Sequence, residues 1–220
     1  MDYGVRVLRF ADYPVVPWRN GGGVTREIAA SAVAVASTAL DGAGPAFPSA
    51  GPSWRISMAT VDDEVPFSSF PGLRRMLGVV DGEGIELSVD GRMRTVRRGE
   101  TFGPFAGEAP ASARPLDGPT LDLGLMIDPA RVRGGMRVIG AGEHDLVGLI
   151  WFIVSLIDGL DVSLNGSPAA TLARRDTAAL DLRTGPIARL SLSAAAGAAN
   201  ALPDFADAAA PLAYLLSVSH

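Results

Sequence analysis

The sequence predicts an all-β protein whose chain forms two similar barrels or sandwiches. Short runs that alternate apolar and polar residues are separated at close intervals by turns such as VDG (89–91) and LNG (164–166). Alternation with a period of two is typical of half-buried strands, and Asp-Gly or Asn-Gly turns connect antiparallel neighbours. The segment 81–101 resembles the segment 158–177, so one β module is predicted to occur twice in the chain.

Matching residues define this repeat. Three pairs match at spacings of 75 to 77 positions: Asp81-Gly82 with Asp158-Gly159, Asp90-Gly91 with Asn165-Gly166, and Thr95 with Thr171. An Arg-Arg pair follows in both segments, at 97–98 and at 174–175. We therefore expect a hairpin in each half of the chain with a tight turn at its tip.

Local composition predicts the remaining elements. Residues 32–53, rich in Ala, Gly, Pro and Ser, predict a surface loop that is either a lid or an ordinary insertion. The run 69–77 indicates a turn or short helix, GAGEHDL (140–146) a loop, and 194–210 a loop with at most a short helix. The 11 apolar residues at 147–157 fall short of the roughly 20 that a membrane helix needs, and indicate a buried strand or core helix.

Composition excludes several classes of function. The 220 residues carry a net charge of −5, which argues against a general nucleic-acid-binding protein. All 19 basic residues are Arg and Cys is absent, which excludes lysine Schiff bases, phosphate-loop lysines, thiol nucleophiles and disulfides. The first ten residues carry charges where a signal peptide would have its apolar core, so we expect a cytoplasmic protein with no membrane partner.

A metal centre is not expected either. The only two histidines are His144 and His220, so the first half of the chain has no histidine ligand. The acidic run VDDEV (61–65) offers carboxylates for a hard cation, although a solvated turn is the expected structure there. The sequence therefore predicts no metal and no cofactor.

The stretch PWRNGGGVTREI (17–28) is the most unusual of the chain. Its three consecutive glycines each cost roughly 0.5–1 kcal/mol of backbone entropy relative to Ala. Either they form a bare tight bend, or the N–H groups of Gly22 and Gly23 approach a small carboxylate or amide. Trp18 either stacks on a ligand or plugs a barrel end, and Asn20 either binds a ligand or caps a turn. A nucleotide-phosphate loop is disfavoured because Lys is absent and a strand follows.

Two predicted strands place polar side chains on one face. In VTREI (24–28), Thr25 and Glu27 share a face, which we assign to the barrel interior. In WRISMA (54–59), Arg55 and Ser57 share one face and three apolar residues share the other. One face of a barrel strand lines the interior, so Arg55 and Ser57 are either surface residues or part of a polar cavity.

Four motifs occur in a fixed order: PWRNGGGVTREI (17–28), WRISMATV (54–61), PFSSFPGLRRML (66–77) and LDGPTLDLGLM (116–126). Together they resemble the HutD/Ves family of bicupins, and the stretch 77–107 has the strand and turn spacing of a cupin. The resemblance covers roughly residues 5 to 128, whereas the internal repeat alone indicates a second cupin. It implies two double-stranded β-helix barrels, a first at 1–130 with the motifs and a second, weaker one at 131–220.

The resemblance also implies a function. Such a protein is expected to be a metal-free small-molecule-binding bicupin, a sensor or modulator of histidine catabolism rather than a pathway enzyme. Arg55 then faces the cavity and anchors an anion, while Glu27 holds Arg55 or accepts a ligand N–H. Orientation of the ligand is assigned to Asn20, Thr25, Ser57 and the backbone of Gly22 and Gly23. Formylglutamate, urocanate and glutamate are the first candidate ligands.

The sequence leaves other functions open. A metal-free cupin enzyme of the isomerase or epimerase type would use Glu27 as its base, but no partner acid is evident. A structural or interaction protein with an incidental cavity is a third class, and a homodimer is left open. One departure from the family bears on the ligand: Gly124 stands where the last motif usually carries Asn.

Overall fold

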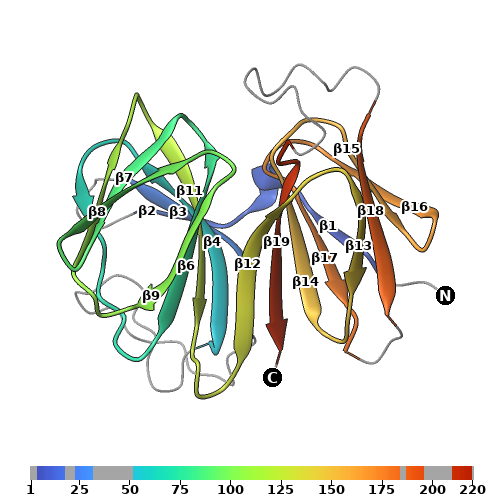
Figure 1. Cartoon of the computed structure of the whole chain (residues 1–220), viewed down its shortest axis with the longest axis horizontal. Helices are drawn as coiled ribbons and strands as arrows, with labels where there is room; N and C mark the ends of the chain where they lie inside the picture. Colours follow the sequence, from blue (N-terminus) through green and yellow to red (C-terminus); the bar gives the residue numbers. More distant parts are fainter. Residues whose placement is uncertain (1–3, 18–22, 32–51, 184–186, 196–209, 220) are drawn as a thin grey trace. The chain divides into compact units, whose positions relative to one another are not determined.

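The computed structural model describes residues 4–17, 23–31, 52–183, 187–195 and 210–219 (Figure 1). Strands dominate these residues, and their only helical element is the 3₁₀ turn η1 (Phe10–Asp12), which confirms the all-β prediction. None of the helical structure described is long and apolar enough to cross a membrane. The chain forms two compact units, which we call the first barrel (Pro14–Arg133) and the second barrel (Met1–Tyr13 with Gly134–Ser219).

The first barrel consists of two facing sheets. One sheet has the order β2 (Val15–Pro17), β3 (Val24–Ala30), β4 (Trp54–Val61), β11 (Thr120–Ile127), β6 (Arg74–Asp81) and β9 (Thr101–Ala106). The other has the order β5 (Val65–Pro66), β10 (Ala111–Pro115), β7 (Gly84–Val89) and β8 (Arg92–Arg97). Leu77 and Val79 of the first sheet and Ile85 and Leu87 of the second belong to one hydrophobic core, so the two inner faces meet.

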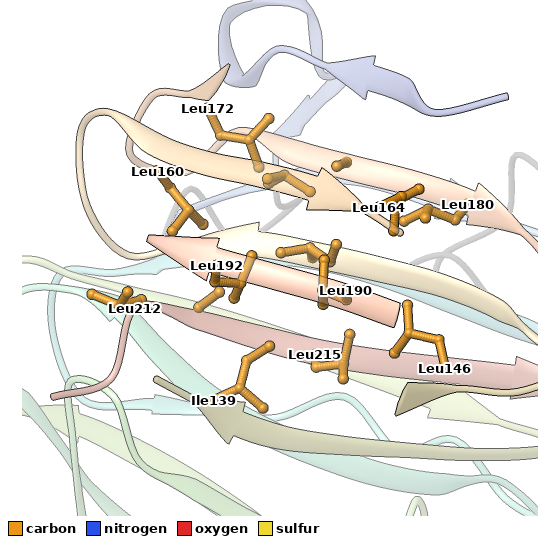
Figure 2. Close-up of a cluster of buried hydrophobic side chains, with 14 of the residues drawn as sticks. Ile139, Leu146, Leu160, Leu164, Leu172, Leu180, Leu190, Leu192, Leu212 and Leu215 are labelled. Atoms are coloured by element: carbon orange, nitrogen blue, oxygen red, sulfur yellow. The ribbon is translucent and has the colours of Figure 1, made fainter. Parts of the chain in front are cut away.

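The second barrel repeats this plan. Its first sheet has the order β1 (Arg6–Leu8), β17 (Thr177–Asp181), β14 (Ile150–Ser155), β19 (Ala213–Ser219) and β12 (Arg133–Ile139). Its second sheet has the order β13 (Gly142–Leu146), β18 (Ala188–Ala194), β15 (Leu160–Leu164) and β16 (Ser167–Leu172). The core between them is rich in leucine, with Leu164, Leu180, Leu190 and Leu215 among its members (Figure 2).

The internal repeat is present at the level of backbone geometry. Hairpin β7–β8 turns at Asp90 and Gly91 with φ of 51° and 73°, and hairpin β15–β16 turns at Asn165 and Gly166 with φ of 49° and 78°. Positive φ at both central residues is what a type I′ turn requires, which explains the Asp-Gly and Asn-Gly pairs. The barrels share the order β4-β11-β6-β9 and β12-β19-β14-β17 in one sheet, the order of all four strands in the other, and the same hairpin, which makes the chain a bicupin.

When the two barrels are matched by their backbone hydrogen bonds, the arginine pairs at 97–98 and 174–175 are offset by one residue. Gly99 N donates to Val79 O at 3.1 Å, and Arg175 N donates to Ser155 O at 2.8 Å, so Arg175 corresponds to Gly99 at a spacing of 76. The next residues, Glu100 and Asp176, close the same turn in the two barrels. Arg175 has a φ of 74°, close to the 78° of Gly99, so a side chain occupies a conformation that glycine adopts more readily.

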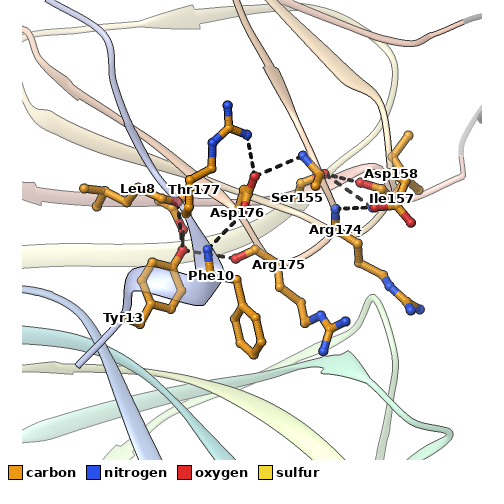
Figure 3. Close-up of polar contacts among 12 residues, drawn as sticks. Leu8, Phe10, Tyr13, Ser155, Ile157, Asp158, Arg174, Arg175, Asp176 and Thr177 are labelled. Atoms are coloured by element: carbon orange, nitrogen blue, oxygen red, sulfur yellow. Dashed lines mark hydrogen bonds and ion pairs between the residues drawn. The ribbon is translucent and has the colours of Figure 1, made fainter. Parts of the chain in front are cut away.

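The N-terminal segment belongs to the second barrel. Strand β1 pairs with β17, and the buried Asp176 carboxylate accepts hydrogen bonds from Arg9 Nη1 at 2.6 Å and from the Phe10 backbone N–H at 2.9 Å (Figure 3). The Tyr13 hydroxyl shares a hydrogen bond of 2.7 Å with Thr177 Oγ1. Burial raises the pKa of the Tyr13 phenol, which keeps it neutral. These contacts join residues 6–13 to strand β17 and to Asp176, which directly precedes it.

Several local predictions were wrong or fall outside the described residues. The run 69–77 contains a turn at Pro71 and Gly72, but from Arg74 it is strand β6 rather than helix. GAGEHDL, interpreted as a loop, contributes strand β13, whereas the apolar run at 147–157 contains strand β14, one of the two alternatives. Most of the expected loops, 32–51 and 196–209, lie outside the described residues.

Candidate ligand-binding site

Three neighbouring strands of the first barrel place two arginines at the same level. Met126 of β11 lies opposite Arg55 of β4 on one side and opposite Arg75 of β6 on the other. Residues two and four positions along a strand share its face, and Leu77 and Val79 belong to the core between the two sheets. Arg55, Met126 and Arg75 therefore lie on the inner face of the barrel.

Arg55 is a buried cation in apolar surroundings. Only 8% of its surface is exposed, its Nη2 lies 3.8 Å from Met126 Sδ, and its guanidinium carbon lies 5.7 Å from the centroid of the Phe70 ring. Burial lowers the pKa of the Arg55 guanidinium, and the Glu27 carboxylate opposes that shift by attraction. Glu27 is therefore close enough to act on Arg55 electrostatically.

Arg75 is a functional candidate that the sequence analysis did not select. Its guanidinium carbon lies 4.7 Å from the ring centroid of Phe67, 5.5 Å from that of Phe105 and 5.6 Å from that of Phe70. Burial lowers the pKa of Arg75 to about 10, and the positive charge of Arg55 contributes to this shift. Aromatic faces offset part of the cost of removing a guanidinium from water.

Asp122 adds a buried carboxyl group to the same face. It is 7% exposed, and its Oδ1 accepts a hydrogen bond of 3.0 Å from the backbone N–H of Ala59. Burial raises the pKa of Asp122 to about 7, while this hydrogen bond and the attraction of Arg75 oppose the shift. A carboxyl with such a pKa exchanges its proton near neutral pH, so it can either donate or accept a hydrogen bond.

The strand register brings four of the predicted site residues together. On β3, Thr25 lies opposite Ala59 and Glu27 opposite Ser57, and a bulge follows between Glu27 and Ala29. Ser57 is buried and lies two positions from Arg55 on the same face of β4. Gly23 directly precedes β3. Trp18, Asn20 and Gly22 lie outside the described residues.

Other titratable groups considered from the sequence lie elsewhere. His144 sits on β13 of the second barrel, where one ring nitrogen lies 3.1 Å from Gly140 O. Residues 62–64 connect β4 to β5. In the described part of the chain, no three His, Cys, Asp or Glu side chains are grouped so that they could hold a metal ion.

The second barrel does not repeat these charges at matching positions. Because Arg75 and Trp151 are 76 positions apart, the strand register matches Met126 with Ser217 and Asp122 with Ala213. Arg75, Met126 and Asp122 are thus replaced by an indole, a hydroxyl and a methyl group at these compared positions. The fold is duplicated, but the buried charges that mark a candidate site belong to the first barrel.

These features define a bicupin with an arginine-lined first barrel, and comparison with known proteins places it in a family. The chain belongs to the HutD family, whose model matches residues 10–200. It is 35% identical over 134 residues to an uncharacterized 21.2 kDa protein in the hutC 3′ region of Pseudomonas putida, and 35% identical over 127 residues to protein Ves of Cronobacter sakazakii. The matches span 60% and 57% of this chain, and 63% and 61% of those relatives.

Solved structures share the whole fold. A conserved protein of unknown function from Pseudomonas aeruginosa PAO1 is 27% identical with a TM-score of 0.73, over 98% of this chain and 97% of that one. HutD from Pseudomonas fluorescens SBW25, in a structure described as the formate condition, is 25% identical with a TM-score of 0.72, over 98% of both chains. Protein Ylba from E. coli, at 9% identity and a TM-score of 0.58, shares the fold alone.

Proposed function

We propose that this protein is a metal-free bicupin that binds a small carboxylate or amide metabolite in its first barrel. The observation that carries the proposal is the pair of arginines, Arg55 and Arg75, on either side of Met126 on the inner face. Burial lowers the pKa of both, and their mutual repulsion lowers that of Arg75 further. A bound carboxylate offsets this repulsion and accepts two parallel N–H bonds from a planar guanidinium.

The other predicted residues complete the binding site in this proposal. Thr25 and Ser57 offer hydroxyl groups on the same face as Arg55, and Glu27 holds Arg55 by attraction or accepts a ligand N–H. The backbone of Gly22 and Gly23 and the side chain of Asn20 orient the rest of the ligand, as their position before β3 suggests. Phe70, whose ring lies beneath both guanidinium groups at 5.6–5.7 Å, supplies an apolar wall.

The names of the relatives support a biological role in histidine catabolism. One relative is encoded in a hutC region and one similar structure is named HutD, which supports a ligand drawn from histidine catabolism. We assign a sensor or modulator role, because the paired arginines supply binding of an anion. Formylglutamate, urocanate and glutamate are therefore the first ligands to test.

Three arginine variants test the anion site. The ligand at about 100 times its dissociation constant adds roughly 2.7 kcal/mol of stability, which corresponds to a melting shift of about 5–11 °C for a chain of this size. We expect Arg55→Ala and Arg75→Ala to lose most of this shift. The matched control is Arg74→Ala, which removes an exposed charge from the other face of β6 and keeps the shift.

Two outcomes would contradict the assignment. A full ligand shift in both Arg55→Ala and Arg75→Ala places the anchor elsewhere in the protein. Equal loss of the melting shift in all three variants would show that binding depends on the net charge of the protein and not on the inner face of the first barrel. Circular dichroism of the unliganded variants distinguishes a lost ligand site from a lost fold.

A further inference from the structure

On the inner face of the first barrel, one position next to the level of the arginines is a glycine and so has no side chain. Gly124 lies two residues from Met126 and two from Asp122 on β11, with Ser57 and Leu77 opposite it on the neighbouring strands. A Cβ atom at position 124 would meet a single heavy atom within 4 Å, the backbone oxygen of Ser57 at 3.8 Å. Space for a side chain is therefore open there although no side chain fills it.

The second barrel fills the corresponding position. Leu77 and Ile153 are 76 positions apart, and their partners on the next strand are Gly124 and Leu215. Leu215 is 1% exposed and packs in the leucine-rich core (Figure 2). The same fold thus accommodates a large apolar side chain at this level in one barrel and leaves it open in the other. Close-packed interiors contain few such spaces, so an open one beside two arginines is a place for a bound molecule.

We propose that Gly124 determines ligand size: the body of the ligand lies over Gly124, with its carboxylate at Arg55 and Arg75 and a hydrogen-bonding group directed at Asp122. This inference rests on the proposed function. Four residues along a strand span roughly 13 Å, so the distance from Met126 to Asp122 suits an amino-acid-sized molecule better than a one- or two-carbon acid. The ligand class is a small carboxylate with an amide or amine several atoms away.

The chemistry of Asp122 fits this end of the ligand. Among the described contacts, its carboxyl accepts one hydrogen bond, from the backbone N–H of Ala59 to Oδ1. In its ionised form Asp122 accepts a ligand N–H, and in its protonated form it donates to a ligand carbonyl. An amide presents both groups, so it satisfies Asp122 in either protonation state.

The test compares two carboxylates that differ in their amide arm. Acetate and N-acetyl-β-alanine are titrated into wild type, Gly124→Leu and Gly124→Ala by calorimetry or NMR. We expect wild type to bind N-acetyl-β-alanine at least about tenfold more tightly than acetate. Gly124→Leu, which introduces the residue of the second barrel, should weaken N-acetyl-β-alanine about tenfold or more and change acetate by less than about threefold. Gly124→Ala should give a smaller loss in the same direction.

The outcomes separate this inference from the anion site. Wild type that binds acetate without preferring N-acetyl-β-alanine overturns the size assignment and leaves the arginine site intact. Equal weakening of both anions by a folded Gly124 variant, or no change in either, also overturns it. If wild type binds neither anion, this inference fails, whereas the proposed function fails only if formylglutamate, urocanate and glutamate do not bind either. Gly124→Ala keeps the test decisive if Gly124→Leu does not fold.

Discussion

At the scale of single residues, the first barrel is distinguished by charged groups withdrawn from solvent to different degrees: Arg55 and Asp122 are buried, whereas Arg75 is half-buried and donates to Ser68 O at 3.2 Å. Two guanidinium groups lie against the ring of Phe70 and a carboxyl lies below them. Such groups are costly to bury unless they are paired, and here each partner offsets part of the cost of another. Asp122 attracts Arg75, and Glu27 attracts Arg55. Binding of an anion is favoured here because the two cations lie at the same level of the sheet.

Asp122 makes stability depend on pH in a definite direction. Its folded pKa of about 7 lies above the ordinary 3.8 of the unfolded chain, so folding takes up a proton between these values. The contribution of Asp122 to stability therefore falls as pH rises from about 4 to about 7 and is constant above. We expect Asp122→Asn, which keeps an acceptor for Ala59 N, to remove this fall. At pH 8 the unfolding free energy of this variant should exceed that of wild type by about 4 kcal/mol or less.

Urea unfolding of both proteins at pH 4, 6 and 8 measures this difference. The matched control is Asp117→Asn, which removes an exposed carboxylate and should leave the pH profile of the wild type unchanged. A constant free-energy difference between Asp122→Asn and wild type across this range would mean that Asp122 has an ordinary pKa in the folded protein.

The two arginines show what a sequence can and cannot indicate. Arg55 lies in a run that alternates cleanly, WRISMA, which groups it with Ser57 on one face, and the family resemblance assigned that face to the cavity. Arg75 follows Pro71 and Gly72 in a run with two adjacent arginines, and this local pattern fits a turn or helix as well as a strand. Asp122 stands among leucines in a motif that identifies the family but not the burial of its acid. Burial of Arg75 and Asp122 depends on the pairing of β6 with β11, two strands that are distant in sequence.

At the scale of elements, hairpins were predictable and distant pairings were not. Asp-Gly and Asn-Gly fix the two type I′ turns locally, so β7–β8 and β15–β16 follow from the sequence. Strand β1, in contrast, pairs with β17, whose residues lie about 170 positions away. Nothing in three residues, Arg6–Leu8, specifies that partner. The contacts of Asp176 and Tyr13 supply the specificity that the short strand lacks.

The hydrogen bond between Tyr13 and Thr177 provides a measurable test of this attachment. Tyr13→Phe keeps the ring but leaves the buried Thr177 hydroxyl and the carbonyl of Arg175 without the phenol. We expect a loss of about 1–3 kcal/mol in unfolding free energy. Thr177→Val should cost a similar amount, and the double variant should cost clearly less than the sum of the two. Strict additivity would mean that the two hydroxyl groups contribute independently to stability.

At the scale of the whole molecule, the chain uses one fold twice, and the cluster of Arg55, Arg75 and Asp122 lies on the inner face of the first barrel. Eight strands of each barrel share their order and the hairpin geometry matches, whereas the compared inner positions change from Arg75 to Trp151 and from Gly124 to Leu215. The second barrel has a continuous leucine-rich core, as expected for a unit that contributes stability. Duplication of a barrel leaves one copy free to lose apolar packing, and in the proposed function a ligand supplies the missing contacts.

This division predicts where a ligand protects the backbone. A carboxylate at about 100 times its dissociation constant adds roughly 2.7 kcal/mol to the state that binds it, which slows exchange through openings of that state by about 100-fold. We expect slowed hydrogen exchange on β4, β6 and β11, which carry Arg55, Arg75 and Met126. Amides of β14, β17 and β19, whose core is separate, should change much less because their local openings do not disturb the arginines.

Arg55→Ala measured with the same ligand is the control, and it should abolish the protection of β4, β6 and β11. Equal protection of both sets of strands would show that the barrels open together, and protection confined to β14, β17 and β19 would place the ligand in the second barrel.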